Sequence, residues 1–110
     1  MPAATTIAVD TPVATLINVF SVQPDRQHEL VDLLARATEE VMQHQPGFVA
    51  ANIHASADGS RVVNYAQWES EDAFHTMLDD PAAQEHMGQA AAIADKFEPH
   101  LYTVASVHHR

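Results

Sequence analysis

Cysteine is absent from all 110 residues of the sequence, which excludes disulfides, thiolate metal sites and a cysteine nucleophile. Basic residues are also scarce. Five lysines and arginines stand against 15 aspartates and glutamates, which gives a formal net charge of −10. This imbalance argues against binding nucleic acid through its phosphates and against docking on anionic lipid.

Long apolar runs are missing too. No segment reaches the ~18 consecutive apolar residues of a membrane span, and residues 1–13 lack the basic start and apolar stretch of a secretory signal. We therefore expect a soluble, cytoplasmic protein that does not associate with membranes. The length and the 46% hydrophobic content fit one domain with a modest core. The expected boundaries are a flexible leader at 1–13, the domain at 14–107 and a tail at 108–110.

The hydrophobic pattern predicts four strands and two helical regions. The strands are expected at 14–22, 48–56, 61–68 and 100–107, and the helical regions at 24–45 and 71–97. Ile7–Val9 is a weaker candidate for an edge strand. Ser70 and Asp80 are expected helix N-caps, Asp58-Gly59 is a strong hairpin-turn signal, and Glu98-Pro99 is expected to end the second helical region.

The order β-α-β-β-α-β is typical of the α+β ferredoxin-like fold, in which helices cover one face of a four-stranded antiparallel sheet. The other face is left without a covering layer. The expected last strand carries apolar groups on both sides, so neither face of the sheet suits water. We therefore expect a second copy to cover it, sheet against sheet, in a homodimer.

The third expected strand carries the most informative side chains. Because residues alternate across a strand, Asn64 and Trp68 share one face with Val62 and Ala66, and Tyr65 lies on the other face. The only tryptophan offers a flat apolar wall with one N–H donor, and the asparagine offers an amide. This pair suits a planar, oxygenated, mostly apolar ligand. Alternatively, Trp68 is a core anchor and Asn64 a hydrogen-bonded buried amide.

The sequence of the same strand also resembles that of a known protein family. The run VNYAQWES over residues 63–70, preceded by HASADG at 54–59 and PGF at 46–48, resembles the antibiotic biosynthesis monooxygenase family, in particular its quinone-forming members. The resemblance spans about residues 14–107 and implies a dimeric α+β barrel. It also implies an enzyme that uses O₂ without a cofactor or metal to convert an anthrone- or naphthol-like aromatic polyketide into a quinone.

The resemblance also implies a site. Asn64 and Trp68 match strand residues that contact substrate in those relatives. Phe74 stands where they have a tyrosine, and keeps the ring without the hydroxyl. One of their arginines falls near His86 or Met87.

The chemistry further requires a proton acceptor, for which His86 is the first candidate and His75 the second. The oxyanion donors are expected to be Asn64 and the Trp68 N–H, with Asn18 or Tyr65 as further candidates. The expected catalytic residues are Asn64, Trp68 and His86, and the expected substrate-binding residues are Asn18, Phe20, Tyr65, Phe74, His75, Met77 and Met87.

Two other interpretations stay open. A haem-degrading branch of the superfamily has an asparagine on its first strand, a tryptophan on its long helix and an iron-ligating histidine. Asn18 and His86 fit two of these positions, whereas the helical tryptophan falls near Met77 and is absent. The remaining interpretation is a non-catalytic or other small-molecule-binding member of the fold, because fold does not fix function.

Overall fold

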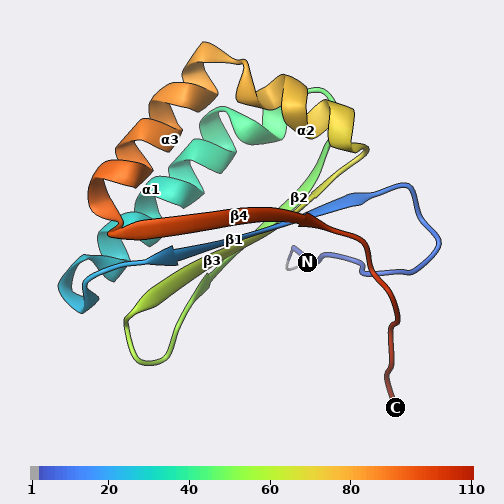
Figure 1. Cartoon of the computed structure of the whole chain (residues 1–110), viewed down its shortest axis with the longest axis horizontal. Coiled ribbons are helices and arrows are strands. Elements are labelled where there is room, and N and C mark those ends of the chain that lie inside the picture. Colours follow the sequence, from blue (N-terminus) through green and yellow to red (C-terminus); the bar gives the residue numbers. More distant parts are fainter. Residues whose placement is uncertain (1–2) are drawn as a thin grey trace.

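The computed structural model describes residues 3–110, and in this part of the chain three α-helices lie on one side of a four-stranded sheet (Figure 1). The strands are β1 (Ala14–Ser21), β2 (Phe48–Ala55), β3 (Arg61–Trp68) and β4 (Lys96–Tyr102), and the α-helices are α1 (Gln27–Glu40), α2 (Glu71–Leu78) and α3 (Pro81–Ile93). Every strand pair is antiparallel, in the order β2-β3-β1-β4. The predicted ferredoxin-like fold is thereby confirmed.

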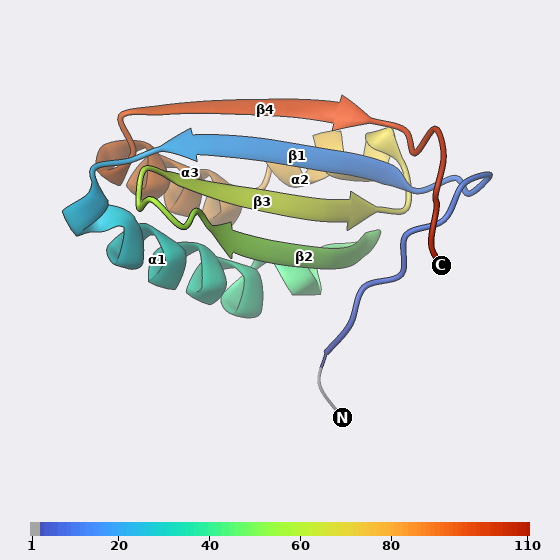
Figure 2. The ribbon, with the colours of Figure 1, turned by 90° about the horizontal axis from the view of Figure 1, so that it is seen from below.

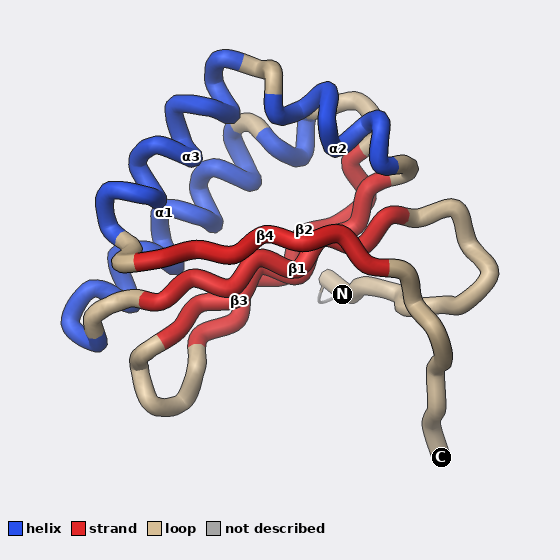
Figure 3. Tube along the Cα trace, in the orientation of Figure 1, coloured by secondary structure: helices blue, strands red, loops and turns tan. Residues whose placement is uncertain are grey.

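The molecule has two layers, which the tube in Figure 3 separates by colour. Figure 2 shows the sheet from its other side, where the strands face the viewer and the helices lie behind them. No helix of residues 3–110 covers this outer face. Part of it is covered by the segment before β1, because the Gln67 side chain donates to the Thr6 carbonyl and the Thr5 hydroxyl donates to Asn52.

The register of the two central strands fixes which side chains face the helices. Asn18 of β1 lies opposite Asn64 of β3, and Leu16 lies opposite Ala66. Directly opposed residues of antiparallel strands share a face, so these side chains gather on the inner side of the sheet. The predicted alternation along both strands is confirmed.

The predicted helix starts are also confirmed. The Ser70 hydroxyl accepts from the Ala73 backbone N–H at 3.0 Å, and the Asp80 carboxylate accepts from the Ala83 N–H at 2.9 Å. Each side chain satisfies an N–H that has no partner within its own helix. These caps hold α2 and α3 as two separate helices.

The prediction for the end of the chain was wrong. Helix α3 ends at Ile93, and Lys96–Tyr102 forms β4, so Pro99 lies inside a strand instead of ending a helix. Proline is compatible with this position because β4 is an edge strand, and a residue there can lack an N–H without breaking a ladder. Phe97 therefore belongs to the sheet.

Two smaller expectations also differ from the structure. The first helical region is divided, since α1 ends at Glu40 and is flanked by 3₁₀ turns at Pro24–Arg26 and Met42–His44. The segment Ile7–Val9 forms no strand. The preceding residues Thr5 and Thr6 form hydrogen bonds with Asn52 of β2 and Gln67 of β3. Ile7–Val9 itself forms no ladder with the edge strand β2.

Two hydrophobic clusters form the core between the layers. One surrounds Trp68 and includes Phe74 and Met77, and the other surrounds Leu30 and includes Phe20 and Val62. Trp68, Leu30 and Val62 are the largest fully buried side chains. The candidate site is lined by members of both clusters.

Candidate active site

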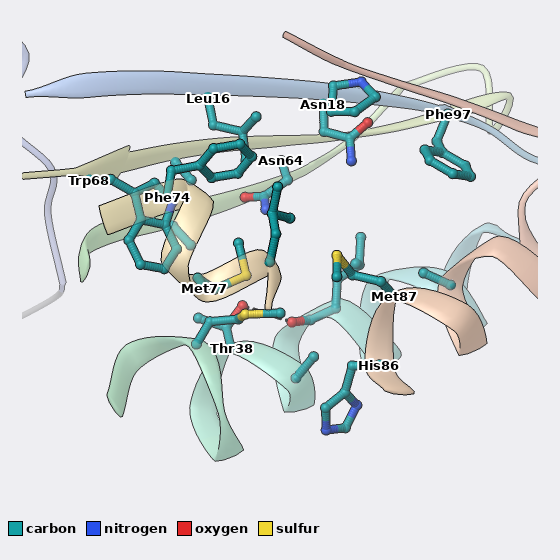
Figure 4. Close-up of a pocket in the computed structure, with 18 of the residues that line it drawn as sticks. Leu16, Asn18, Thr38, Asn64, Trp68, Phe74, Met77, His86, Met87 and Phe97 are labelled. Carbon is teal, nitrogen blue, oxygen red and sulfur yellow. Dashed lines mark hydrogen bonds between the residues drawn. The ribbon is translucent and has the colours of Figure 1, made fainter. Parts of the chain in front are cut away.

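A cavity of about 270 Å³ lies between the inner face of the sheet and the three α-helices. Its volume is near the lower end of the range for small-molecule pockets. Most of its lining is apolar, and none of the five lysines and arginines lines it. Figure 4 shows its labelled residues in four groups: Trp68 and Phe74 at one end, Phe97 and Met87 toward the other, Asn18 and Asn64 on the sheet side, and Thr38 and His86 on the helix side.

The sheet wall carries two carboxamides. Asn18 and Asn64 are direct cross-strand neighbours, and both line the cavity. The Oδ1 atom of each is buried and has no hydrogen-bond partner within residues 3–110. Such atoms are rare in native proteins, because leaving a buried acceptor unpaired costs about 1–3 kcal/mol. Two adjacent cases on one wall indicate a place for a polar ligand.

The aromatic end is built around Trp68, whose ring is 2% exposed. Phe48 and Phe74 meet it edge-on, with ring centroids 5.5 Å and 6.3 Å away. Its Nε1 is buried without a partner. The indole therefore serves as a core residue and also leaves one donor unused beside the cavity.

The helix wall places Thr38 of α1, Met77 of α2 and both His86 and Met87 of α3 around the cavity. The Thr38 hydroxyl is already engaged, since it donates to the Leu34 carbonyl at 2.8 Å. His86 is different. Its side chain is 18% exposed, and its Nδ1 is buried without a partner. A neutral imidazole can accept a proton, which makes His86 the candidate base on this wall.

Phe97 is a lining residue that the sequence analysis missed. It lies on β4 opposite Phe20, with ring centroids 6.2 Å apart, and it is 47% exposed. Its assignment to the end of a helix concealed this pairing. The signal that could have revealed it is the alternation of Phe97 and Leu101 around Pro99, which places both on the inner face of a strand.

The structure brings eight of the ten predicted site residues to the cavity: Asn18, Phe20, Asn64, Trp68, Phe74, Met77, His86 and Met87. Tyr65 and His75 are not among the residues that line this cavity. Tyr65 projects from the opposite face of β3, where its hydroxyl lies 3.4 Å from Gln67. His75 follows the buried Phe74 on α2 and is exposed, because adjacent helical positions point in different directions.

Residues 3–110 contain no group of three or more metal-ligating side chains. Within the same range, no helix combines the length and apolar character that a membrane crossing demands.

A family comparison agrees with this architecture. The sequence model of the antibiotic biosynthesis monooxygenases matches residues 14–91, which is more than half of the chain. This chain belongs to the antibiotic biosynthesis monooxygenase family. The family resemblance is thereby confirmed, and with it the prediction that the chain is a monooxygenase.

Three relatives of this monooxygenase come from Streptomyces species. Tetracenomycin-F1 monooxygenase of Streptomyces glaucescens is 46% identical over 89 residues, which cover 81% of this chain and 80% of the relative. The ActVA-Orf6 monooxygenase of Streptomyces coelicolor, solved in complex with nanaomycin D, is 32% identical with a TM-score of 0.80 and covers 88% and 91% of the two chains. SnoaB of Streptomyces nogalater, a cofactor-independent oxygenase, is 26% identical with a TM-score of 0.79 and covers 88% and 97%. The similarity to SnoaB supports the expectation that the reaction needs no cofactor.

Proposed function

We propose that this monooxygenase oxidises an anthrone- or naphthol-like aromatic polyketide to a quinone with O₂ and without a cofactor. The observation that carries the proposal is a set of three buried polar atoms, Asn18 Oδ1, Asn64 Oδ1 and Trp68 Nε1, which belong to residues that line a mostly apolar cavity and have no partner within residues 3–110. A flat aromatic ligand with oxygen substituents matches both the walls and these atoms. The tetracenomycin-F1, ActVA-Orf6 and SnoaB relatives support a substrate of this class.

The proposed reaction begins at an activated methylene carbon beside aromatic rings and a carbonyl group. His86 accepts one proton, and the resulting electron-rich enolate reduces O₂ directly. A carbon–oxygen bond forms and gives a peroxide, whose O–O bond then breaks with loss of water. One oxygen atom of O₂ ends in the new carbonyl group and the other in water. The electrons come from the substrate, so the balance requires no other reductant.

The protein has a small set of tasks in this reaction. The Trp68 N–H and the Asn64 amide nitrogen stabilise the negative charge that develops on the substrate oxygen, a contribution worth about 10²–10³ in rate per donor. The apolar walls keep water from the enolate and from the peroxide. Because no lysine or arginine lines the cavity, these neutral donors and His86 carry the charge stabilisation.

The proposal is tested with dithranol, an anthrone. Purified protein is mixed with dithranol under anaerobic conditions without added flavin or metal, oxygen is admitted, and quinone absorbance is followed. We expect a rate well above that of buffer alone and of a Trp68→Phe variant. A rate equal to that of buffer, for dithranol and for naphthol analogues alike, contradicts the proposal.

The same protein separates the two alternatives. In a haem titration we expect no Soret shift that depends on His86, whereas a shift that is lost in His86→Ala would support haem binding. For a non-catalytic role, Trp68→Phe and Asn64→Ala would change the melting temperature and leave the oxidation rate at the buffer level throughout.

We also propose that the enzyme is a homodimer joined through the outer face of its sheet. The outer face carries exposed apolar side chains on edge strands, with Val49 45% and Tyr102 46% exposed. Ile17, Val19 and Val63 lie between them on the central strands and are partly exposed. A second copy would remove this apolar surface from water.

A further inference from the structure

Glu40 lies outside the cavity, yet it is the only ion-pair partner of His86 within residues 3–110. Glu40 is the last residue of α1, and His86 lies in the middle of α3, which packs against α1. The Glu40 Oε2 and His86 Nε2 atoms are 4.0 Å apart. The Glu40 side chain is 64% exposed and the His86 side chain 18%, so the carboxylate stands at the surface and the imidazole between surface and cavity.

The two nitrogens of His86 have different surroundings. Nε2 faces the carboxylate, and Nδ1 is buried without a partner. A neutral imidazole carries one proton, and an adjacent carboxylate favours the form with that proton on Nε2. The lone pair of Nδ1 is then free to accept a proton. In this arrangement the buried nitrogen is the base, and the outer nitrogen faces the carboxylate at a distance of 4.0 Å.

Within residues 3–110, no other carboxylate lies within ion-pair distance of this imidazole. The cavity-lining residues of α1 and α2 include no charged side chain, and the sheet contributes one further histidine, His100. The negative charge facing His86 therefore comes from Glu40. A proton gained on Nδ1 makes an imidazolium whose attraction to this carboxylate is stronger than that of the neutral ring.

We propose that Glu40 and His86 form an acid–base couple in which Glu40 is a positioning residue. The inference rests on the proposed oxidation. His86 Nδ1 takes the proton when the substrate carbon–hydrogen bond breaks, and the electron pair stays on the enolate that reduces O₂. The imidazolium, stabilised by Glu40, then returns the same proton to the peroxide anion. The carbon then loses its second hydrogen as a proton while the O–O bond breaks, and this proton leaves with the departing oxygen as water. Glu40 and His86 are then back in their starting protonation states.

The test compares Glu40→Gln with Glu39→Gln. Glutamine keeps the shape of the side chain and removes its charge. Glu39 is the preceding, exposed residue of the same helix, and in the described part of the chain its side chain makes no ion pair or hydrogen bond. With dithranol as substrate, we expect Glu40→Gln to lower kcat about tenfold with little change in KM, whereas Glu39→Gln keeps the wild-type values. Glu40→Asp should recover part of the loss.

A further readout separates positioning from a merely structural role. Nitrogen-15 NMR of the His86 ring should show the proton on Nε2 in the wild type and a mixture of both forms in Glu40→Gln.

The outcomes distinguish the two proposals. If the wild type forms no quinone, the proposed function fails, and the NMR comparison alone decides whether the couple exists. If the wild type is active while Glu40→Gln and Glu39→Gln agree in kcat and ring tautomer, the couple is overturned and the proposed function stands.

Discussion

At the scale of single residues, the cavity places polar atoms where folding alone favours apolar ones. Asn18 and Asn64 are half-buried cross-strand neighbours on the central strands, and within residues 3–110 neither of their buried Oδ1 atoms has a hydrogen-bond partner. A sequence selected for stability alone would place leucine or valine at these positions. The unpaired carboxamides are therefore better explained by a ligand than by the core.

This difference predicts opposite effects on stability and activity. Asn64→Leu keeps a similar volume and removes an unpaired buried acceptor, so we expect the free energy of unfolding to rise by up to about 1 kcal/mol. Quinone formation should fall about 100-fold or more, because an oxyanion donor is lost. Chemical denaturation and the dithranol assay measure the two effects.

Asn52→Leu is the matched control. Asn52 lies on the adjacent strand, but its side chain is satisfied: it donates to the Tyr65 carbonyl at 3.0 Å and accepts from Thr5 at 2.7 Å. We expect this variant to lose about 1–3 kcal/mol of stability and to keep its activity. If Asn64→Leu instead lost stability while turnover was unaffected, Asn64 would be a structural residue.

Sequence reasoning could place these side chains, but it could not place all of the site. Alternation along β3 is a local rule, so it located Asn64 and Trp68 correctly, and the same rule separates Tyr65 from them. The proximity of Glu40 to His86 depends on how two helices pack, which a single sequence does not specify. Phe97 was misplaced because Pro99 was interpreted as a helix breaker without knowing that the strand containing it lies at an edge.

At the scale of elements, Gly47, the residue before β2, packs against the junction between β3 and α2. Its φ is +83°, and its carbonyl accepts from the Glu69 N–H at 2.7 Å. A Cβ at this position would lie 2.5 Å from the Ala73 Cβ, in the first turn of α2. The close approach sets the position of the helix that carries Phe74 and Met77 into the cavity.

Gly47→Ala therefore combines a strained backbone with a steric conflict between two rigid segments. We expect a loss of about 2–3 kcal/mol of stability, together with reduced turnover as α2 shifts. Gly88→Ala is the control, because a Cβ there meets no atom within 4 Å and α3 gains a better helix former, worth up to about 1 kcal/mol. Thermal melts of the two variants should move in opposite directions. Equal shifts would contradict the assigned role of Gly47.

The turn between β2 and β3 predicts a dependence of stability on pH. The Ser60 hydroxyl and backbone N–H, followed by the Ser56 hydroxyl, donate to Asp58 and lower the pKa of its carboxyl from 3.8 to about 2. Because the pKa is lower in the folded state, the stabilisation is fully present above the unfolded value, and it is lost as pH falls through about 2. The melting temperature of the wild type should therefore exceed that of Asp58→Asn at pH 5–7, with a difference that shrinks between pH 4 and pH 2. Parallel melting curves down to pH 2 would contradict this role.

At the scale of the whole molecule, the two faces of the sheet have different tasks. The inner face lines the cavity. The outer face carries exposed apolar side chains beside Thr5 and Thr6, which are hydrogen-bonded to the sheet. Each copy also has a formal net charge of −10, so two copies repel each other at long range. Association then depends on the apolar face, and salt should strengthen it by screening the repulsion.

We expect light scattering to give twice the 12.0 kDa mass of one chain, with tighter association at 0.5 M than at 0.02 M salt. Val19→Glu should produce monomers, because it places a charge in the middle of the outer face, opposite Val63. Gln89→Glu adds the same charge at an exposed position of α3 and should stay dimeric. The cavity lies on the opposite side of the sheet, so monomeric Val19→Glu should still oxidise dithranol. A monomeric wild type at micromolar concentration in both salts would show that the outer face is not a dimer interface.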